Sequence, residues 1–398
     1  MPSPWVETED PYLRSTLMSL TDAGVLNGPA NIYPLRWSLI NDVSFDPTSS
    51  LSTELAQFMY SMRSAQLNRG NKRVSLSGGS ESISNVWFGD VKREKWAVES
   101  SYQYMANSYA FRLNTSYVEN NGDPKVSWHD SYFAFNAGRV LFDISTTSKW
   151  WGQGWNHNLI LASTGDDLDS SLSWMADSHS FGVWSVNAMF SKLDKKDYEY
   201  RASVRLVNRL FHGLEWGLSQ HYWFDSKTDK PQSAPKQTGF DWRIVMPDLL
   251  DTQHVFYGEL ASSQRSGSGW IGASMVGWSI YKPIGRNSVR VVVERQVMDD
   301  EEQQSLELMG LGDYLSSSYL LTDSWSISSY IQLDNDHRAS ITAAKETSIG
   351  KQSADENKYQ LSYQIPVFDG MLTWTADYIS LKNQDSKWYV WSSYEFRF

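Results

Sequence analysis

The chain ends on residues 388–398, WYVWSSYEFRF, and this stretch indicates the fold. Alternate residues form one largely apolar face, made of Trp388, Val390, Ser392, Tyr394, Phe396 and Phe398. A half-apolar strand of about ten residues is long enough to cross a hydrocarbon core at a tilt. Aromatic residues at both ends and a C-terminal Phe are typical of the strand that closes a bacterial outer-membrane barrel. We therefore expect an all-β membrane protein.

Composition is compatible with this interpretation and excludes two other classes of protein. The 398 residues include 19 Trp and 21 Tyr, which suit both membrane interfaces and surfaces that stack on sugars. A mean hydropathy of -0.47 and the lack of a long apolar run exclude a helical membrane protein, whereas alternating strands are hydrophilic on average. The net charge of -11 argues against nucleic acid as a partner. The chain has no cysteine, which fits a protein of the cell envelope.

Residues 1–70 are predicted to form a separate helical segment. Asp10 can cap a helix that has Pro11 at its first position and continues to Gly24. A short helix over 35–43 and a third helix from Ser52 to about Gly70 follow. Three short helices cannot build a large core of their own. We expect them to close the periplasmic end of a barrel formed by residues 71–398.

From Lys72 onward the apolar period is two, and one face repeatedly carries charged or amide side chains that suit a polar lumen. The pattern predicts about eighteen antiparallel strands, near 73–81, 95–105, 108–118, 128–136, 138–146, 169–176, 180–191, 199–208, 212–223, 238–246, 252–262, 269–281, 288–298, 324–333, 337–348, 357–365, 370–381 and 388–398. Every second connection is short, whereas the alternate ones, 82–94, 147–168, 224–237, 299–323 and 349–356, are long and polar. Short periplasmic turns and long outer loops are typical of outer-membrane barrels. We expect the long loops to occlude the lumen.

The stretch 148–163, SKWWGQGWNHNLILAS, suits neither a regular strand nor a helix, because it has three Trp within six residues and two Gly between them. It resembles the Trp-Trp-Gly-Pro-Gly-Trp stretch of the Wzi family, outer-membrane lectins of group 1 capsule assembly. The match comprises Trp150, Trp151, Gly152, Gly154, Trp155 and the following NLIL. The N-terminal stretch 3–38, with its Pro-Leu-x-Trp step, is also similar. The resemblance implies an eighteen-stranded barrel with a periplasmic helical plug.

The departures from the family pattern concern the binding residues. The acidic and Arg positions before the Trp pair are Ser148 and Lys149 here, and the Pro is Gln153. A polar Asn/Arg stretch is replaced by residues 163–167, STGDD. The resemblance therefore supports the fold but leaves the identity of the polysaccharide open.

Several side chains of this stretch are candidates for contact with a glycan. The indoles of Trp150, Trp151 and Trp155 could stack on pyranose rings, or they could instead anchor the loop in the barrel. Lys149, Gln153, Asp166 and Asp167 could form hydrogen bonds with sugar hydroxyls. The simpler interpretation of Lys149, Asp166 and Asp167 is that they are charged loop residues exposed to solvent. The acidic run 299–302 lacks the spacing of a metal loop and is read as a solvated loop. We expect no metal and no cofactor.

The leading functional hypothesis is a non-enzymatic lectin in the outer membrane of a Gram-negative bacterium, which anchors capsular or other exopolysaccharide. The alternative is an outer-membrane porin or sugar channel, and the two differ in whether the lumen is closed. His157 and Ser163 are the nearest approach to a nucleophilic pair, but no nucleophile elbow accompanies them. Expected partners are membrane lipid, lipopolysaccharide and the barrel-assembly machinery.

Overall fold

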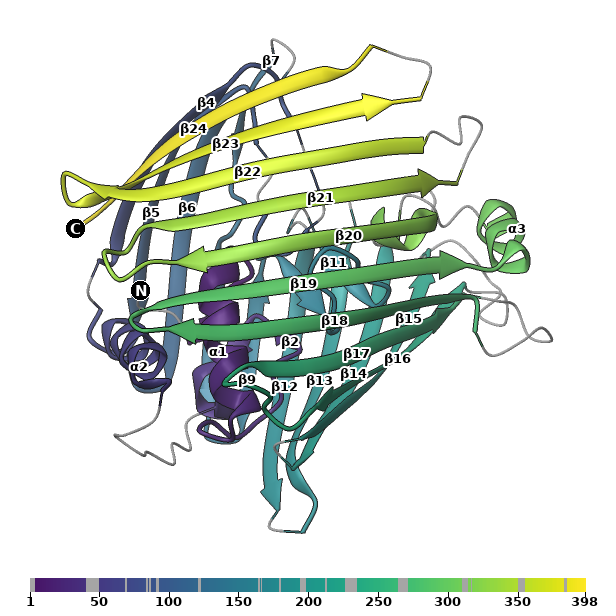
Figure 1. The fold of residues 1–398 in the computed structure, drawn as a ribbon, viewed down its shortest axis with the longest axis horizontal. Coiled ribbons are helices and arrows are strands. Elements are labelled where there is room, and N and C mark those ends of the chain that lie inside the picture. Colours follow the sequence, from purple (N-terminus) through teal and green to yellow (C-terminus); the bar gives the residue numbers. More distant parts are fainter. Residues whose placement is uncertain are drawn as a thin grey trace.

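The computed structural model describes residues 4–398 apart from 41–49, 69, 84, 86, 91–92, 121–122, 164, 166, 179, 194–197, 212, 226–234, 264–270, 310–313, 316, 350–354 and 383–384. Most of these residues form one closed antiparallel barrel (Figure 1). The first wall strand, β4 (Lys72–Gly79), pairs with the last, β24 (Lys387–Arg397), so the sheet has no free edge. The predicted antiparallel β-barrel is confirmed.

The predicted strands agree closely with those of the wall. In chain order the others are β5 (Trp96–Met105), β6 (Tyr109–Asn120), β7 (Asp123–Ser127), β8 (Tyr132–Ala137), β9 (Val140–Ser145), β12 (Leu168–Ser178), β13 (Gly182–Lys192), β14 (Tyr200–Phe211), β15 (Leu214–Phe224), β16 (Lys236–Val245), β17 (Gln253–Ser262), β18 (Ala273–Ile284), β19 (Asn287–Met298), β20 (Leu321–Gln332), β21 (Arg338–Ser348), β22 (Asp355–Val367) and β23 (Gly370–Leu381). Both β7 and β8 pair with β6, so they are two halves of one interrupted strand, and the barrel has eighteen strand positions. The prediction missed the first half, β7. Asp130 lies in the interruption with a positive φ of 61°.

The wall alternates as a membrane barrel requires. On β19 the side chains of Arg290, Glu294 and Gln296 are buried inside the barrel, whereas the alternate Val293 and Val297 are exposed on the outside. The same alternation buries Arg201, Arg205 and Asp377 on other strands. The outer surface is therefore apolar and the lumen polar, the reverse of a soluble protein.

Two of the three helices predicted for the N-terminal segment are present, together with three short strands that were not predicted. Asp10 caps α1 (Pro11–Asp22) by accepting hydrogen bonds from the Tyr12 and Leu13 amides, at 3.0 and 2.9 Å. α2 (Ser52–Gln66) buries Leu55, Phe58 and Met62 on one stripe. The helix predicted over 35–43 is wrong in its described part. Residues Leu35–Arg36 form β3, which pairs with β1 (Trp5–Val6), and Trp37–Ile40 form a single 3-10 turn.

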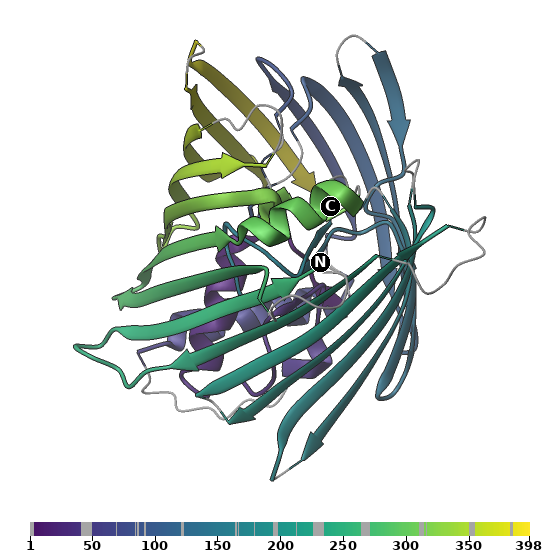
Figure 2. The ribbon, with the colours of Figure 1, turned by 90° about the vertical axis from the view of Figure 1, so that its right-hand side faces the viewer.

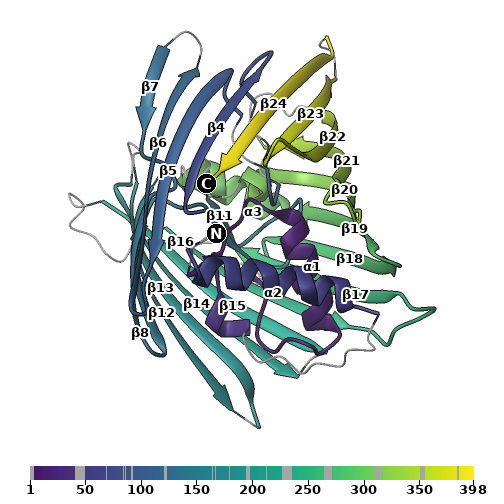
Figure 3. The same ribbon diagram turned by 90° about the vertical axis from the view of Figure 1, so that its left-hand side faces the viewer.

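The N-terminal segment lies inside the ring of strands, at the end where the chain terminates (Figure 3). Wall arginines bind the polar groups of α1. Arg290 donates to the Ser15 hydroxyl and carbonyl at 2.9 and 3.0 Å, and Arg243 pairs with Asp22. Leu17 and Leu20 are fully buried in the same cluster as wall residues such as Tyr257 and Val292. None of the helices described is long and apolar enough to span a membrane.

A third helix, α3 (Asp300–Met309), lies at the opposite end of the barrel (Figure 2). It contains part of the acidic run that was predicted to be a solvated loop, and that prediction is wrong for Glu302. The Glu302 carboxylate is fully buried and accepts hydrogen bonds from the Ser263 amide at 2.7 Å and the Tyr319 hydroxyl at 2.6 Å. These hydrogen bonds attach the 299–323 connection to Ser263, the residue that follows β17.

We predict that deletion of Phe398 impairs closure of the barrel. Its amide and carbonyl exchange hydrogen bonds with Lys72 at 3.0 and 3.2 Å, and its ring stacks on Phe396. Each lost hydrogen bond should destabilise the closing pair by about 1 kcal/mol. The fraction of folded, heat-modifiable protein in membranes should fall several-fold, whereas Phe398→Trp, which retains the backbone pairing, should assemble normally. An unchanged folded fraction after the deletion would contradict this role of the last residue.

Candidate functional site

The segment that resembles the Wzi motif crosses the inside of the barrel. Residues Lys149–Trp151 (β10) pair on one side with Leu161–Ser163 (β11) and on the other with Ile32–Tyr33 (β2) of the N-terminal segment. This connection, which we predicted to be one of the long loops that occlude the lumen, folds inward and joins the N-terminal segment in a small internal sheet. Sequence alone did not show that its strand partner lay more than a hundred residues upstream.

The three indoles of this segment are buried, with exposed fractions of 4% for Trp150, 3% for Trp151 and 1% for Trp155. Trp155 packs against Tyr330 with ring centres 5.0 Å apart, and Trp151 lies 5.8 Å from the ring of His221. The Trp150 indole nitrogen donates to the Gly154 carbonyl at 3.0 Å. Within the described chain, packing thus accounts for most of the surface of all three rings.

Two wall carboxylates bind the turn that follows β10. Glu294 accepts hydrogen bonds from the amides of Trp155, Asn156 and His157 at 2.6, 2.8 and 2.9 Å. Glu259 accepts from the amides of Gly154 and Leu159 at 2.9 and 2.7 Å. A buried carboxylate that accepts several backbone N–H groups is satisfied without a metal or a lysine. The turn is therefore fixed to the wall by its backbone.

The glycines of the motif are required by this close approach. Gly152 has a φ of +128°, and a Cβ there would lie 2.3 Å from a Glu259 carboxylate oxygen. A Cβ on Gly154 would lie 1.6 Å from the His157 carbonyl oxygen. Only glycine fits either position.

Arg14 of α1 connects the N-terminal segment to this turn. Its guanidinium is fully buried and donates to the carbonyls of Gly154 and Gln153 at 2.9 and 3.0 Å. It also lies over the rings of Phe88 and Trp155, at 4.1 and 4.5 Å from their centres. Burial lowers the pKa of Arg14, with only distant anionic or phenolic groups to oppose it. The arginine is held by carbonyls and aromatic faces, a geometry that a lysine could not reproduce.

A polar cavity of about 620 Å³ remains on one side of the lumen, beside the inward faces of β4, β5, β6, β7 and β24. Three indoles contribute to its lining, those of Trp87, Trp150 and Trp391. The wall contributes hydroxyl groups, from Ser75, Ser77, Ser116, Ser127 and Ser393. Aromatic faces combined with hydroxyl and carboxylate groups are the features that bind a polyhydroxylated ligand.

The charged groups of the cavity are mainly acidic. Three bases line it, Arg73, Lys125 and Lys149, and they face six carboxylates, those of Glu9, Asp90, Glu94, Glu99, Asp130 and Glu395. Burial raises the pKa of Asp90, although the Arg93 guanidinium beside it acts in the opposite direction. The excess of carboxylates disfavours a strongly anionic ligand unless cations accompany it.

The predicted site residues divide into three groups. Trp150 and Lys149 line the cavity, and the Lys149 ammonium also lies 3.3 Å from Asp169. Trp151, Trp155 and Gln153 are buried away from it, and the Gln153 amide donates to Glu215 and Asp241 at 3.2 and 3.1 Å. Asp167 lies 3.5 Å from Arg201, and Asp166 lies outside the described residues.

Sequence analysis did not identify the other wall of the cavity. Residues 87–90, WFGD, extend into the lumen, where the Phe88 amide donates to the Trp155 carbonyl at 2.7 Å. In the sequence, this segment is an aromatic pair followed by a glycine within a long polar connection. The same kind of pattern distinguished residues 148–163. Gly89 has a φ of +82°, and a Cβ there would collide with the Pro11 ring. Trp391 lies on the face of 388–398 opposite the apolar one, but the alternation did not show that it lines a cavity.

No family model matches the sequence, and no curated protein matches it. Several solved structures match it in fold. One is Wzi of Escherichia coli, described as an outer-membrane protein involved in group 1 capsule assembly and as a carbohydrate-binding β-barrel. The two chains are 16% identical, with 98% of this chain and 99% of Wzi covered and a TM-score of 0.82. The resemblance found in the sequence is thereby confirmed at the level of the fold.

Two barrels of Pseudomonas aeruginosa match less well. OccK3 (OpdO) is 9% identical, with 82% of this chain and 95% of that chain covered and a TM-score of 0.50. OpdK is 8% identical, with 82% and 98% covered and the same TM-score. At these identities the similarity concerns the barrel alone.

We predict that Arg14→Ala destabilises the contact between the N-terminal segment and the turn at 153–157. The substitution leaves two buried carbonyls without a donor and a void between Phe88 and Trp155. The cost should be about 3 kcal/mol, because buried carbonyls that lose a charged donor cannot reach water. The unfolding temperature of the variant in detergent should be lower than that of the wild type. Its conductance in a planar bilayer should be higher.

Arg63→Ala on the exposed face of α2 is the matched control and should change neither quantity. Equal stability and conductance of the Arg14 variant and the wild type would show that this arginine does not hold the lumen closed.

Proposed function

We propose that this chain is an outer-membrane barrel that binds capsular or another surface polysaccharide and anchors it at the cell surface. The observation that carries the proposal is the luminal cavity of about 620 Å³, which combines indole faces with hydroxyls and carboxylates. The fold shared with Wzi, a barrel described as carbohydrate-binding, supports the same class of ligand. Shared fold alone would not suffice, because one barrel fold serves many functions.

The lumen holds too much chain for the free passage of solutes. In this proposal residues 1–70 act as a plug at the periplasmic end, and β10, β11 and the turn between them fill the middle of the barrel. Arg14, Leu17, Leu20 and Trp155 are each at most 1% exposed, so the described part of this filling is closely packed. A glycan would therefore enter the cavity from the outer side and stay there. This supports a binding function more than transport.

The outer face of the wall accounts for the proposed location. Large apolar side chains exposed there come from strands around the barrel, among them Leu113, Phe133, Val204, Leu218, Val276 and Ile341. Such a face is stable only against lipid, so membrane lipid and lipopolysaccharide are its proposed neighbours. Assembly by the barrel-insertion machinery follows from the same proposal, because a closed barrel must form in the membrane.

Within the cavity, Trp150 offers an indole face and Lys149 a hydrogen-bond donor, so these two of the predicted residues remain proposed glycan contacts. Trp87 and Trp391 join them as further aromatic faces. We assign Trp151, Trp155 and Gln153 to the support of the turn, because their polar and aromatic partners are all within the protein. Asp167 is proposed to fix the rim through Arg201, and Asp166 stays a predicted contact.

We propose a binding protein in preference to an enzyme. The His157 ring, which the sequence offered as a partner for a nucleophile, is fully buried and lies 3.2 Å from Glu294. The same carboxylate already accepts three backbone amides, so the pair holds the turn and has no access to a substrate.

We predict that Ser116→Trp abolishes polysaccharide binding. Ser116 points into the cavity from β6, and an indole at this position occupies part of the space that a sugar ring would need. The affinity for polysaccharide extracted from the surface of the producing cells should fall about ten-fold or more, which corresponds to about 1.4 kcal/mol. Cells that express the variant should release polymer into the medium.

Thr115→Trp is the matched control, since it adds the same side chain to the next position of the strand, on the opposite face of the wall. It should bind polysaccharide normally. Wild-type affinity in a folded Ser116→Trp variant would remove the cavity from the binding site.

The channel alternative makes a different prediction for the full-length protein in a planar bilayer. We expect no steady open-channel current, because the turn at 153–157 and α1 fill the lumen. A steady current that a solute can block would favour a porin or sugar channel.

A further inference from the structure

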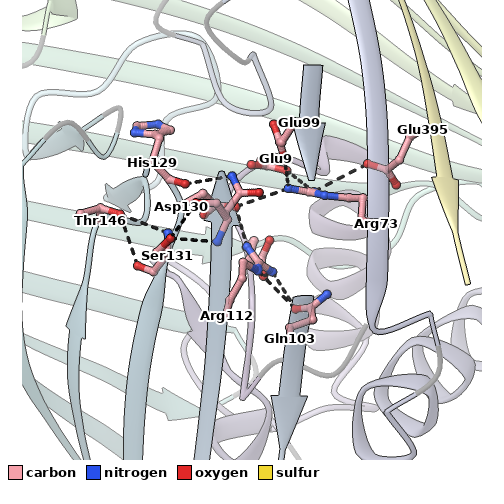
Figure 4. A network of polar contacts seen from close by, with 12 residues as sticks. Glu9, Arg73, Glu99, Gln103, Arg112, His129, Asp130, Ser131, Thr146 and Glu395 are labelled. Atoms are coloured by element: carbon pink, nitrogen blue, oxygen red, sulfur yellow. Dashed lines mark hydrogen bonds and ion pairs between the residues drawn. The ribbon is translucent and has the colours of Figure 1, made fainter. Parts of the chain in front are cut away.

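Three carboxylates meet where the N-terminal segment contacts the wall, at the floor of the cavity. Glu7 and Glu9 belong to the link between β1 and α1, and Asp130 lies in the interruption between β7 and β8. One oxygen atom of each lies within 4.8 Å of the other two. Figure 4 shows this network, in which Arg73 lies between Glu9 and Glu99 on one side and Glu395 on the other.

The arginines nearby do not balance the acids. Arg112 donates to one oxygen each of Glu7 and Asp130. Arg73 pairs closely with Glu99 but is 3.6 Å from Glu9, 3.7 Å from Asp130 and 3.6 Å from Glu395. Arg397 pairs with Glu395. Among the described residues, these five carboxylates face three guanidinium groups, a formal excess of two negative charges, and their side chains are between 1% and 36% exposed.

Glu9 shows the excess most clearly. Within the described part of the chain its carboxylate accepts no hydrogen bond. The distance of 3.6 Å between this carboxylate and the Arg73 guanidinium is longer than a hydrogen bond. A carboxylate in such surroundings is stabilised by a proton or by a further cation.

A neutral side chain gives the second, independent indication of a ligand. Asn114 is 2% exposed and lines the same cavity as Glu9 and Asp130. Its amide nitrogen donates to the His129 carbonyl at 2.9 Å, next to Asp130 in the chain. This bond fixes the orientation of the side chain, yet no donor among the described residues reaches its Oδ1. A buried oxygen without a donor, in the lining of the cavity that Glu9 and Asp130 also line, is a ligand that a metal ion could use.

We propose that Glu7, Glu9, Asp130 and the Asn114 Oδ1 bind a divalent cation, calcium in preference to magnesium, that clamps the N-terminal segment to the barrel wall. The donors are all oxygen atoms, as hard cations require, and they comprise three carboxylates and an amide. Calcium–oxygen distances of about 2.3–2.6 Å allow two ligands of one ion to lie up to about 5 Å apart. The observed spacing of at most 4.8 Å meets that limit, whereas magnesium would require a tighter cluster.

One ion of charge two would balance the formal excess on the five carboxylates. It would also connect chain segments that are far apart in sequence, the N-terminal link and the wall strands β6 to β8. The clamp goes beyond polysaccharide binding and does not depend on it.

Calcium binding to the full-length protein in detergent, after removal of metals with a chelator, tests the proposal. Calcium chloride titrated into wild type should release or take up heat with one saturable site and should raise the unfolding temperature. Glu9→Gln should weaken the affinity about ten-fold or more, because it removes a charged ligand. Asn114→Ala, which leaves every charge in place, should weaken it as well.

Glu94→Gln is the matched control, because Glu94 lines the same cavity but is outside the group of three carboxylates. It should bind calcium as the wild type does. Absence of saturable calcium binding in the wild type would overturn the proposal, and so would an equal loss of affinity in the Glu94 variant. Magnesium binding as tight as that of calcium would overturn the choice of ion. Should Glu9→Gln fail to fold, Asn114→Ala decides, and wild-type affinity in that variant would exclude the site.

Discussion

Backbone N–H and C=O groups find no partners in hydrocarbon, so every wall strand of this chain must be paired on both sides. The ladder between β24 and β4 meets that requirement for the last and first strands and closes the ring. A closed ring of eighteen strand positions fixes the circumference of the barrel. The lumen of such a barrel is too wide for the side chains of the wall to fill by themselves. The positions of the N-terminal segment and of residues 149–163 follow from this constraint, because something must occupy the space that the closed sheet creates.

The material that fills the lumen is held largely by charge. Asp241 of the wall, fully buried, accepts hydrogen bonds from the side chains of Asn31 and Gln153 at 2.7 and 3.1 Å, and Glu294 and Glu259 accept five backbone amides from one turn. Displacing a buried ion from its partners is far more costly than sliding one apolar surface over another. The polar lumen therefore specifies a single position for the turn, and apolar contacts such as Trp155 on Tyr330 complete it.

The strands and the Asp10 cap could be predicted because each has a local cause. Period-two alternation needs no knowledge of the neighbouring strand, and an N-cap Asp followed by Pro and an apolar helical repeat is a signal that lies within a few residues. Leu35–Arg36 could not be assigned in this way, since their strand pairing with Trp5–Val6 arises from a distant contact. The strand partner of β10 in the 147–168 connection was equally hidden. An aromatic, glycine-rich stretch suits both an outer loop and an internal one, and the carboxylates that draw it inward lie on β17 and β19.

The cavity exists because the segments that fill the lumen are bound to one side of the barrel wall. The turn at 153–159 binds carboxylates of β15, β16, β17 and β19, and α1 is bound by Arg243 and Arg290 on the same side. The wall of β4 to β7 is left with short hydroxyl side chains that face open space. At the floor of that space, Glu9 and Asp130 belong both to the cavity lining and to the carboxylate group. A cation there would reduce the negative charge that a ligand meets on entry. The same carboxylates that attach the N-terminal segment to the wall would then set which glycans the cavity accepts.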